Sequence, residues 1–336
     1  MPGTEPLPFE QLNVLLRAAA EPTRLRILTL LAETELTVTD LTDILRQSQP
    51  RISRHLKLLT EAGLVERFRE GSWAFFRLPE GSVGSDIVRG VIGRQDPADP
   101  VAARDRERLV AVRSARAAAA QAYFRAHAGE WDRIRALHVA DAAVEAAILD
   151  ALSDRPFRTL LDLGTGTGRI LELLGAGLER GLGIDLSLAM LSMARARLDR
   201  ASLRQCTVRQ GDIYDLPVPR DSFDVVIIHQ VLHYLDDAAG AIREAARVLR
   251  PGGRLLVVDF APHELEFLRE EHAHQRLGFA PEAIAQWMSG CGLDVTLQRS
   301  LPPEAGSAGK IAVSLWLARD PRLVIAEPAR STREVA

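Results

Sequence analysis

The feature that most constrains the fold is a strand, turn and helix pattern in the second half of the chain. Residues 157–163 (FRTLLDL) are largely apolar and run into a turn with glycine at positions 164, 166 and 168. Glycine lets a backbone turn sharply and approach a ligand closely. From Phe157 onward, short apolar runs alternate with amphipathic helical patterns, which indicates βα units and a parallel sheet.

Two acidic residues end the next two predicted strands. Asp185 closes the strand 181–185 and lies 21 residues after Gly164 (185 − 164), the spacing at which an acid reaches ribose hydroxyls. Asp212 follows the strand 206–210, where its carboxylate could accept a hydrogen bond from an adenine amino group. Each acid alone is better explained as a turn residue or helix cap. The glycine loop and the two acids, on three successive strand ends, favour a cofactor site.

The first eighty residues show a different pattern. Residues 22–32 and 37–45 predict two short helices, and residues 49–63 predict a third that ends at Gly63. Residues 64–78 then predict two strands around a turn at 70–72. This order is typical of a helix-turn-helix followed by a β-hairpin wing.

The charge pattern of this region favours DNA binding. The second motif helix of such a unit enters the major groove. Between Arg46 and Arg77 there are seven Lys or Arg and three acids, a local excess of +4 (7 − 3) in a chain of formal net charge −3. The alternative is a winged helix used only for dimerisation. The predicted DNA-contacting residues are Gln49, Arg51, Ser53, Arg54, Lys57 and Arg69.

Residues 9–78 closely resemble the ArsR/SmtB family of dimeric bacterial repressors, most specifically in the run 48–56 (SQPRISRHL). The resemblance implies a homodimer on a double-stranded DNA operator, and the apolar residues 11–20 fit a dimer interface. The family's arsenic sensors carry Cys-x-Cys at the start of the first motif helix, where this chain has Thr37 and Thr39. Hydroxyls are poor ligands for soft metals, so the resemblance does not extend to metal sensing.

Two later segments complete the C-terminal pattern. Residues 223–234 predict a buried strand that opens into a histidine-containing loop, and residues 245–260 predict a helix stopped at 251–253 and a fifth strand. The five pieces, in this order, resemble the class I S-adenosylmethionine (SAM) methyltransferases, especially the small-molecule branch that includes the ubiquinone-biosynthesis enzymes. The resemblance implies an α/β fold with a doubly wound, Rossmann-like, seven-stranded sheet. Residues 116–132, with Tyr123, Phe124 and Trp131, resemble the lid helices of that branch.

The same resemblance implies roles for the matched residues. The acid of the first strand and the glycine loop would hold the methionine part of SAM. The acid ending the second strand would bind the ribose, and the acid after the third strand the adenine. Residues 229–234 would line the reaction cavity. The implied cofactor-binding residues are Asp162, Gly164, Gly166, Gly168, Asp185, Leu186, Asp212, Ile213 and His229.

Methyl transfer depends mainly on positioning the reactants and excluding water, because the sulfonium of SAM is already activated. A base is needed only where the acceptor carries a proton. The predicted catalytic residues are His229 and His233, with Asp259 and His263 as further candidates. Each of them is also explained as a pocket-lining or structural residue.

Composition excludes several other classes. Two cysteines exclude a disulfide scaffold and a four-cysteine zinc site. The acid–histidine cluster at 270–274 is typical of a charged helix face, so no metal is predicted. There is no signal-peptide pattern, and no apolar run approaches the roughly 20 residues of a membrane span, so the expected location is cytoplasmic and away from membranes.

The predicted domains follow the chain. Residues 1–93 form the winged helix-turn-helix for DNA binding and dimerisation, and residues 94–150 form a linker and lid helices. Residues 151–320 form the methyltransferase domain, and residues 321–336 a flexible tail. The linker begins with a hinge at 93–100 and continues as a long helix, which is either a solvated spacer or a dimerisation helix.

Two functions remain open from sequence. The first is an ArsR-type regulator that transfers methyl from SAM to an unidentified small molecule, leaving S-adenosylhomocysteine (SAH). The second is a transcription factor that senses SAM or SAH without transfer. DNA methylation is disfavoured, because amino-DNA methyltransferases carry an Asn/Asp-Pro-Pro-aromatic tetrapeptide after the fourth strand, where this chain has 229–232 (HQVL). No motif in the sequence identifies the methyl acceptor or the operator.

Overall fold

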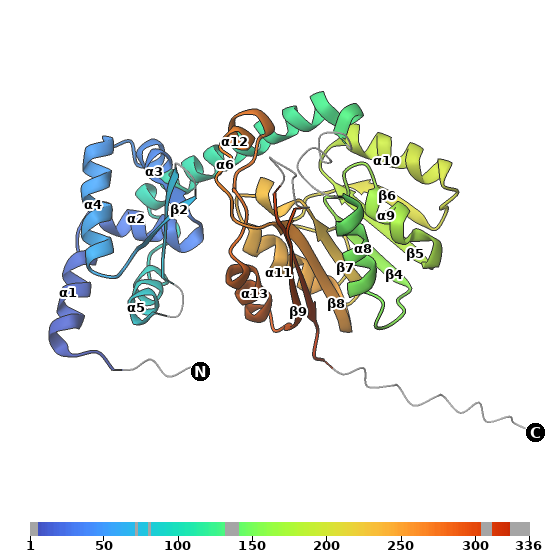
Figure 1. Cartoon of the computed structure of the whole chain (residues 1–336). Coiled ribbons are helices and arrows are strands. Elements are labelled where there is room, and N and C mark those ends of the chain that lie inside the picture. Colours follow the sequence, from blue (N-terminus) through green and yellow to red (C-terminus); the bar gives the residue numbers. More distant parts are fainter. Residues whose placement is uncertain (1–5, 71–72, 80–81, 132–140, 304–310, 323–336) are drawn as a thin grey trace, which may run out of the picture. The chain divides into compact units, whose positions relative to one another are not determined.

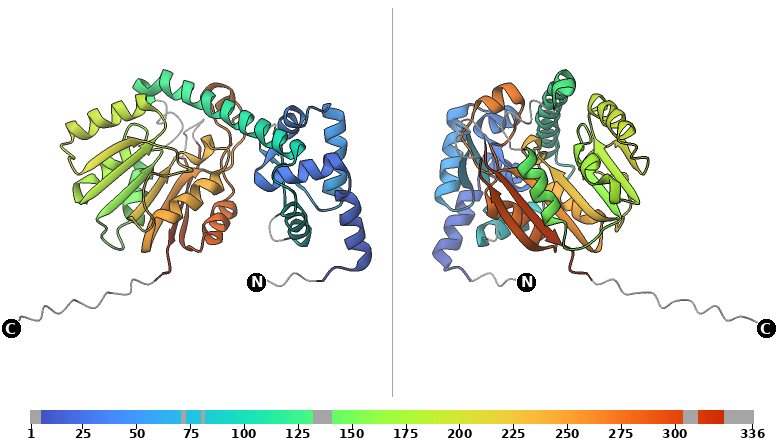
Figure 2. Two further views of the ribbon diagram at one scale, coloured as in Figure 1. Left: turned by 180° about the vertical axis from the view of Figure 1, so that it is seen from behind. Right: turned by 45° about the vertical axis from the view of Figure 1, so that its right-hand side comes forward.

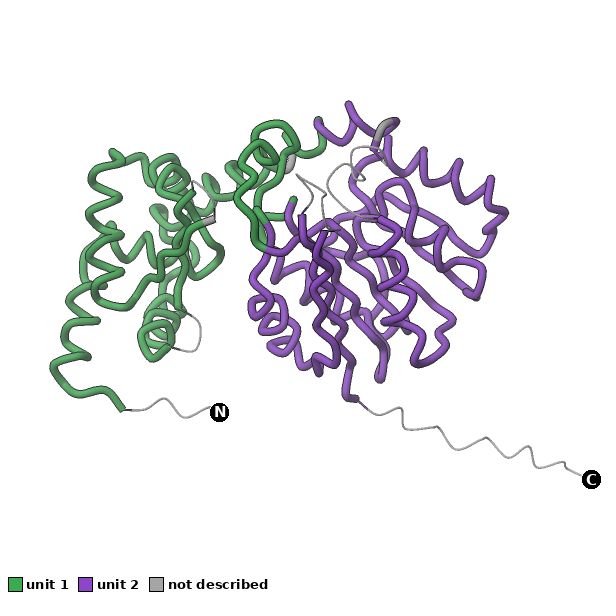
Figure 3. The backbone as a smooth tube through the Cα atoms, viewed as in Figure 1, with its two compact units in different colours: residues 1–122, 234–237, 262–277 green, residues 123–233, 238–261, 278–336 purple. Residues whose placement is uncertain are grey.

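The computed structural model describes residues 6–70, 73–79, 82–131, 141–303 and 311–322. The predicted wing turn at 71–72, part of the predicted lid at 132–140 and the predicted tail beyond residue 322 lie outside the described residues. The chain divides into two compact units (Figure 3). Unit 1 comprises Met1–Ala122, Tyr234–Asp237 and Pro262–Leu277, and unit 2 comprises Tyr123–His233, Ala238–Ala261 and Gly278–Ala336.

Unit 1 contains the predicted helix-turn-helix and wing. Besides its helices, the unit has a three-stranded antiparallel sheet in the order β1-β3-β2 (Figure 1). The elements are α1 (Phe9–Ala19), α2 (Pro22–Glu33), β1 (Leu36–Thr37), α3 (Val38–Leu45), α4 (Gln49–Glu61), β2 (Glu66–Glu70), β3 (Trp73–Arg77), α5 (Val83–Ile92), α6 (Pro100–His127) and α12 (Phe267–His272). Helix α6 continues into unit 2 after Ala122.

The start of α3 explains why the motif helices begin where the sequence predicts. Thr37 Oγ1 accepts a hydrogen bond from the Asp40 amide at 3.2 Å, and an Asp40 carboxylate oxygen accepts from the Thr37 amide at 2.8 Å. This reciprocal capping box satisfies two amides that a helix start leaves without partners. Beneath it, Leu41, Ile52 and Leu56 belong to one buried cluster that fixes α3 against α4.

Unit 2 is the predicted doubly wound α/β domain. Its seven-stranded sheet has the order β6-β5-β4-β7-β8-β10-β9, with β10 antiparallel to both neighbours. Figures 1 and 2 show helices on both faces of the sheet. The elements are η1 (Ala128–Glu130), α8 (Asp141–Ala151), β4 (Thr159–Leu163), α9 (Arg169–Leu174), η2 (Gly175–Gly177), β5 (Arg180–Asp185), α10 (Leu188–Arg200), β6 (Cys206–Gln210), β7 (Phe223–His229), η3 (Leu232–Tyr234), α11 (Ala238–Val248), β8 (Leu249–Phe260), α13 (Pro281–Gly290), β9 (Asp294–Leu301) and β10 (Val313–Arg319).

The strand order confirms the predicted seven-stranded sheet and locates its crevice. β4 lies between β5 and β7, all three parallel, so the winding of the chain reverses at β4. In such sheets ligands bind outside the carboxyl ends of the strands at the point of reversal. The predicted cofactor residues follow the carboxyl ends of β4, β5 and β6.

Two local predictions need correction. The helix predicted to stop at 251–253 ends at Val248, and β8 already begins at Leu249. Phe223 pairs with Leu249 and Val225 with Arg254, so the residues between them bulge from the strand; Pro251 lacks the amide that a helix needs there. The sequence also gave no sign of α5, which Ser82 caps by accepting from the Ser85 amide at 3.1 Å. The predicted hinge follows α5, and the predicted long helix is confirmed as α6.

Among the described helices, none combines the length and the hydropathy that crossing a bilayer requires. Within the same residues, no three His, Cys, Asp or Glu side chains gather as a metal ion would need.

Candidate functional site

The glycine turn after β4 adopts a backbone that only glycine takes easily. The φ angles of Gly164, Gly166 and Gly168 are +69°, +52° and +81°. A Cβ on Gly164 would overlap both methyl groups of Val231, which lies in the loop after β7. The Gly164 amide also donates to the Ile184 carbonyl of β5 at 2.8 Å. The turn is therefore held between the neighbouring strand and the next loop of the sheet.

Asp185, at the end of β5, holds the same turn from the other side. One carboxylate oxygen accepts from the Gly166 amide at 2.9 Å, and the other accepts from the Ser187 amide at 2.8 Å. Burial raises the pKa of Asp185, although these amides oppose the shift. A carboxylate oxygen has more than one lone pair. Both oxygens can therefore still accept from a ligand hydroxyl.

The other predicted cofactor residues lie in different surroundings. Asp162 is buried, and a carboxylate oxygen accepts from Thr165 Oγ1 at 2.6 Å, so this acid braces the glycine turn. Asp212 is exposed after β6 and accepts from the Tyr214 amide at 2.9 Å. Ile213 is buried and Leu186 is exposed. The structure thus brings Asp162, Gly166 and Asp185 together through the turn, and leaves Asp212 at the next strand end.

The predicted catalytic residues separate in the structure. His233 is fully buried, and its Nδ1 lies 2.7 Å from Asp259 Oδ1 at the end of β8. Asp259 is also fully buried and accepts from the Phe260 amide at 2.8 Å. His229 is half-buried at the end of β7, and His263 belongs to unit 1. Sequence reasoning named His233 and Asp259 separately, and the fold makes them a pair.

Gln230 lies in the segment 229–234 that the resemblance places along the reaction cavity, but sequence reasoning gave it no role of its own. It follows β7 directly with φ at +54°, a left-handed backbone that few non-glycine residues adopt. It is only 7% exposed, and its Nε2 has no hydrogen-bond partner among the described residues. Such backbones concentrate at functional sites. Neither its burial nor its left-handed backbone could be read from the sequence.

The predicted lid contributes an aromatic cluster to unit 2. The rings of Phe124 and Trp131 meet edge to face with centroids 5.2 Å apart, and Tyr123 lies 6.0 Å from Phe124. A Cβ on Gly166 would lie 3.7 Å from the indole Nε1 of Trp131. Burial raises the pKa of Tyr123. Trp131 therefore borders the glycine turn.

In unit 1, helix α4 presents its predicted DNA residues to solvent. Ile52, Leu56 and Leu59 face the core. Arg51, Arg54 and Lys57, spaced three apart, share the opposite side. Arg77, counted with the basic residues, instead pairs with Glu66 at 3.0 Å and with Glu35 at 3.3 Å. The six residues predicted to contact DNA are all exposed: Gln49, Arg51, Ser53, Arg54, Lys57 and Arg69.

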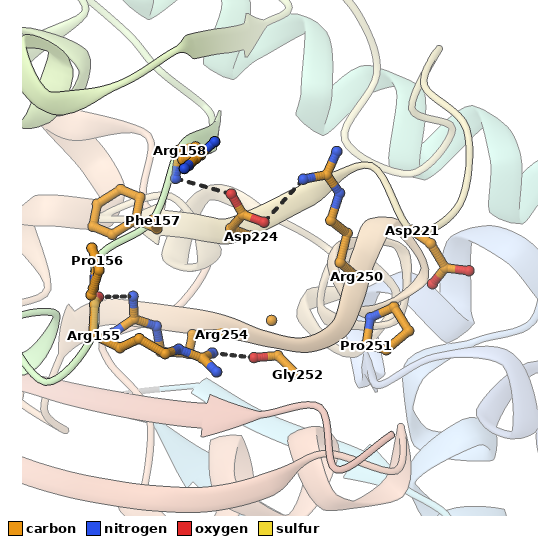
Figure 4. A pocket seen from close by; sticks show the side chains of 11 residues that line it. Arg155, Pro156, Phe157, Arg158, Asp221, Asp224, Arg250, Pro251, Gly252 and Arg254 are labelled. Carbon is orange, nitrogen blue, oxygen red and sulfur yellow. Dashed lines mark hydrogen bonds and ion pairs between the residues drawn. The ribbon is translucent and has the colours of Figure 1, made fainter. Parts of the chain in front are cut away.

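A pocket of about 490 Å³ lies at the amino ends of β4, β7 and β8 (Figure 4). Its charges are matched within the fold. Arg250 pairs with Asp224 at 3.1 Å, and Arg155 donates to the Gly252 carbonyl. Burial favours a higher pKa for Asp224, but amides from residues 158 and 159 lower it below its ordinary value. The pocket is at the strand ends opposite to the glycine turn, so we assign it no part in the site.

Comparison with protein families matches both parts of the chain. The model described as "Methyltransferase domain" matches residues 161–257, and the model described as "Bacterial regulatory protein, arsR family" matches residues 21–67.

Curated relatives match part of the chain. An uncharacterized 37.1 kDa protein in transposon TN4556 of Streptomyces fradiae is 41% identical over 126 residues, 36% of each chain. The 27-O-demethylrifamycin SV methyltransferase of Amycolatopsis mediterranei is 36% identical over 137 residues, 40% of this chain and 50% of that protein. The ubiquinone/menaquinone biosynthesis C-methyltransferase UbiE of Vibrio parahaemolyticus is 36% identical over 126 residues, 35% of this chain and 47% of that protein. The chain thus spans half or less of the length of these relatives.

Among solved structures, a chain of the complex between the Haloferax volcanii Trm112 methyltransferase activator and a putative methyltransferase superposes with a TM-score of 0.51. It is 24% identical, and the match covers 60% of this chain and 98% of that one. This likeness shows the fold.

Proposed function

Because the chain joins an arsR-family helix-turn-helix domain to a class I, SAM-dependent methyltransferase domain, we propose that it is a transcriptional regulator that transfers a methyl group from SAM to a small molecule. The observation that carries the enzymatic half is Asp185 bonded to the Gly166 amide at the point where the sheet reverses. This arrangement puts an acid and a glycine-rich turn where such sheets bind ligands.

The residues present fit the cofactor. The three positive-φ glycines leave a cradle that a Cβ at Gly164 would fill. Asp185 would hold the ribose hydroxyls, and Asp212 with Ile213 would receive the adenine. Bound SAM supplies a methyl group that its sulfonium already activates. The chain contributes binding, orientation and the exclusion of water.

The buried His233–Asp259 pair supports a role toward the acceptor. A carboxylate at Nδ1 favours the tautomer with the proton on that nitrogen, which makes Nε2 the basic one. We therefore assign His233 as the base for an acceptor that carries a proton, with Asp259 positioning its ring. Two relatives are named for demethylrifamycin methylation and for ubiquinone/menaquinone biosynthesis, which supports a small-molecule acceptor.

The proposed cofactor site is tested by one glycine substitution and its matched control. We expect the full chain to bind SAH with micromolar affinity in calorimetry. Gly164→Ala forces a Cβ against Val231 in a left-handed backbone, a strain of about 1–3 kcal/mol, so binding should weaken by roughly tenfold or more. Gly177→Ala, where a Cβ meets nothing within 4 Å, should bind like the wild type. No SAH binding by the wild-type chain, or equal binding by both variants, would contradict the proposal.

The proposed DNA-binding form is a homodimer in the cytoplasm, on a double-stranded operator. Helix α1 contains no buried residue, and Phe9 and Val14 are 84% and 52% exposed. Val91 of α5 is exposed as well. Apolar side chains this exposed on one small domain favour a covered interface.

Light scattering at micromolar concentration should therefore report a dimer. Val14→Asp puts two carboxylates into the proposed interface and should shift the chain towards monomer. Leu149→Asp, at a comparably exposed position of α8 in unit 2, should leave the dimer intact. A monomeric wild-type protein would refute the interface.

A further inference from the structure

Two segments of unit 1 begin within three residues of the His233–Asp259 pair. The first segment, Tyr234–Asp237, follows His233 directly, and the second segment, Pro262–Leu277, begins three residues after Asp259. The two segments contact each other, because the Tyr234 hydroxyl lies 3.4 Å from His274 Nε2. The chain thus passes from unit 2 into unit 1 directly after the proposed base His233 and again two residues after the end of β8.

The first segment is joined to the helix-turn-helix by one guanidinium. Arg116 of α6 donates to Asp236 at 3.0 Å and, with its other terminal nitrogen, to Asp40. The second oxygen of Asp40 accepts from the Thr37 amide and hydroxyl in the capping box of α3. Although burial opposes charge on Arg116, the carboxylates of Asp40 and Asp236 raise its pKa. The Arg116 side chain is part-buried, so leaving its guanidinium without partners would carry a desolvation cost.

The second segment is joined to the wing. Arg276 pairs with Glu35, which also pairs with Arg77 of β3 at 3.3 Å. The Arg276 guanidinium lies 4.9 Å from the centroid of the Phe75 ring, and that of Arg269 lies 5.0 Å from the centroid of the Trp73 ring. Cation–π contacts of this kind hold a segment on an aromatic face.

The ends of the second segment are fixed beside the reaction site. The Phe279 amide donates to the Phe260 carbonyl at 2.9 Å, one residue after Asp259. Gly278 has φ at +89°, and a Cβ there would overlap the Ala261 carbonyl. These two contacts tie the return of the segment to the end of β8, so the two ends of the segment start from one place in unit 2.

From these contacts we propose that ligand in the methyl-transfer site and DNA on the helix-turn-helix are coupled through the two segments, with Arg116 as the positioning residue that links Asp236 to the start of α3. The proposal rests on the proposed function, since it needs SAM or SAH in unit 2. Coupling of this kind is reciprocal, so whatever SAH does to the affinity for DNA, DNA does to the affinity for SAH.

The test measures hydrogen–deuterium exchange of residues 37–61 in the full chain, with and without saturating SAH. In the wild type, SAH should change the exchange rate of the α3 amides by roughly fivefold or more. Asp236→Ala keeps the Arg116–Asp40 pair and the capping box but removes the link, so the change should disappear while calorimetric SAH affinity stays the same. Arg116→Ala should also abolish it. Arg104→Ala, an exposed arginine of the same helix, should behave like the wild type.

The possible failures can be told apart. If SAH does not bind the wild-type chain, the proposed function is wrong. If SAH binds but α3 exchange does not change, or if the change survives in both Asp236→Ala and Arg116→Ala, the coupling is wrong and the proposed function stands.

Discussion

Replacing Asp185 with alanine is expected to weaken SAH binding by about 1–3 kcal/mol, a loss of roughly 5- to 150-fold in affinity. The variant removes the proposed acceptor of the ribose hydroxyls. It also releases the Gly166 and Ser187 amides, which Asp185 holds at 2.9 and 2.8 Å. The loss of the ribose acceptor affects the bound state, whereas the release of the two amides also loosens the glycine turn in the free protein.

Calorimetry on the full chain measures this loss. Asp199→Ala removes the same charge from an exposed position of α10 and is expected to leave the affinity unchanged. Unfolding temperatures of both variants show whether a loss reflects the site or the stability of the domain. If Asp185→Ala and the wild type bind SAH with equal affinity, Asp185 does not bind the cofactor.

The second large effect is expected on DNA. Arg51 and Arg54 lie exposed on α4, the helix proposed to enter the major groove. Each contact to a base edge contributes about 1–3 kcal/mol, so Arg51→Ala/Arg54→Ala should lower the affinity for a specific duplex by roughly 30-fold or more. Where the lost contacts are to phosphates, the slope of the logarithm of the binding constant against the logarithm of the salt concentration should fall in magnitude by about one for each arginine.

The measurement is fluorescence anisotropy with two duplexes of equal length at several salt concentrations. One duplex is selected from a random-sequence library by the wild-type chain, and the other is unrelated. Arg94→Ala/Arg104→Ala removes the same charge from exposed positions outside α4 and should bind both duplexes nearly as the wild type does. If the two double variants weaken binding equally, the loss of affinity comes from the change in overall charge, and α4 is not the helix that reads the DNA.

How well the sequence predicts this molecule depends on how local each feature is. The glycine turn and Asp185 were predictable, because turn geometry and the 21-residue spacing are properties of one stretch of chain. The end of α11 was predicted three residues too late, because the pairing of Leu249 with Phe223 on a neighbouring strand decides it. Arg77 was counted as a free positive charge, whereas Glu35 and Glu66 pair with it in the fold.

The long-range ion pairs within unit 1 were beyond sequence reasoning. Arg116 stands 76 positions from Asp40 and 120 from Asp236, and Arg276 stands 241 positions from Glu35. No periodicity connects residues so far apart. The predicted domains follow chain order, whereas unit 1 also takes in Tyr234–Asp237 and Pro262–Leu277.

The close approach of Ala261 and Gly278 has a consequence for how this chain can diversify. The chain leaves the sheet and returns to it at nearly one point, since Phe279 bonds back to Phe260. A residue gained or lost between 262 and 277 therefore does not shift the register of β8 or the start of α13. Such excursions tolerate insertions far better than the elements they join. Descendants of this chain can lengthen, shorten or rewrite the stretch that meets the wing while the methyltransferase sheet is inherited unaltered.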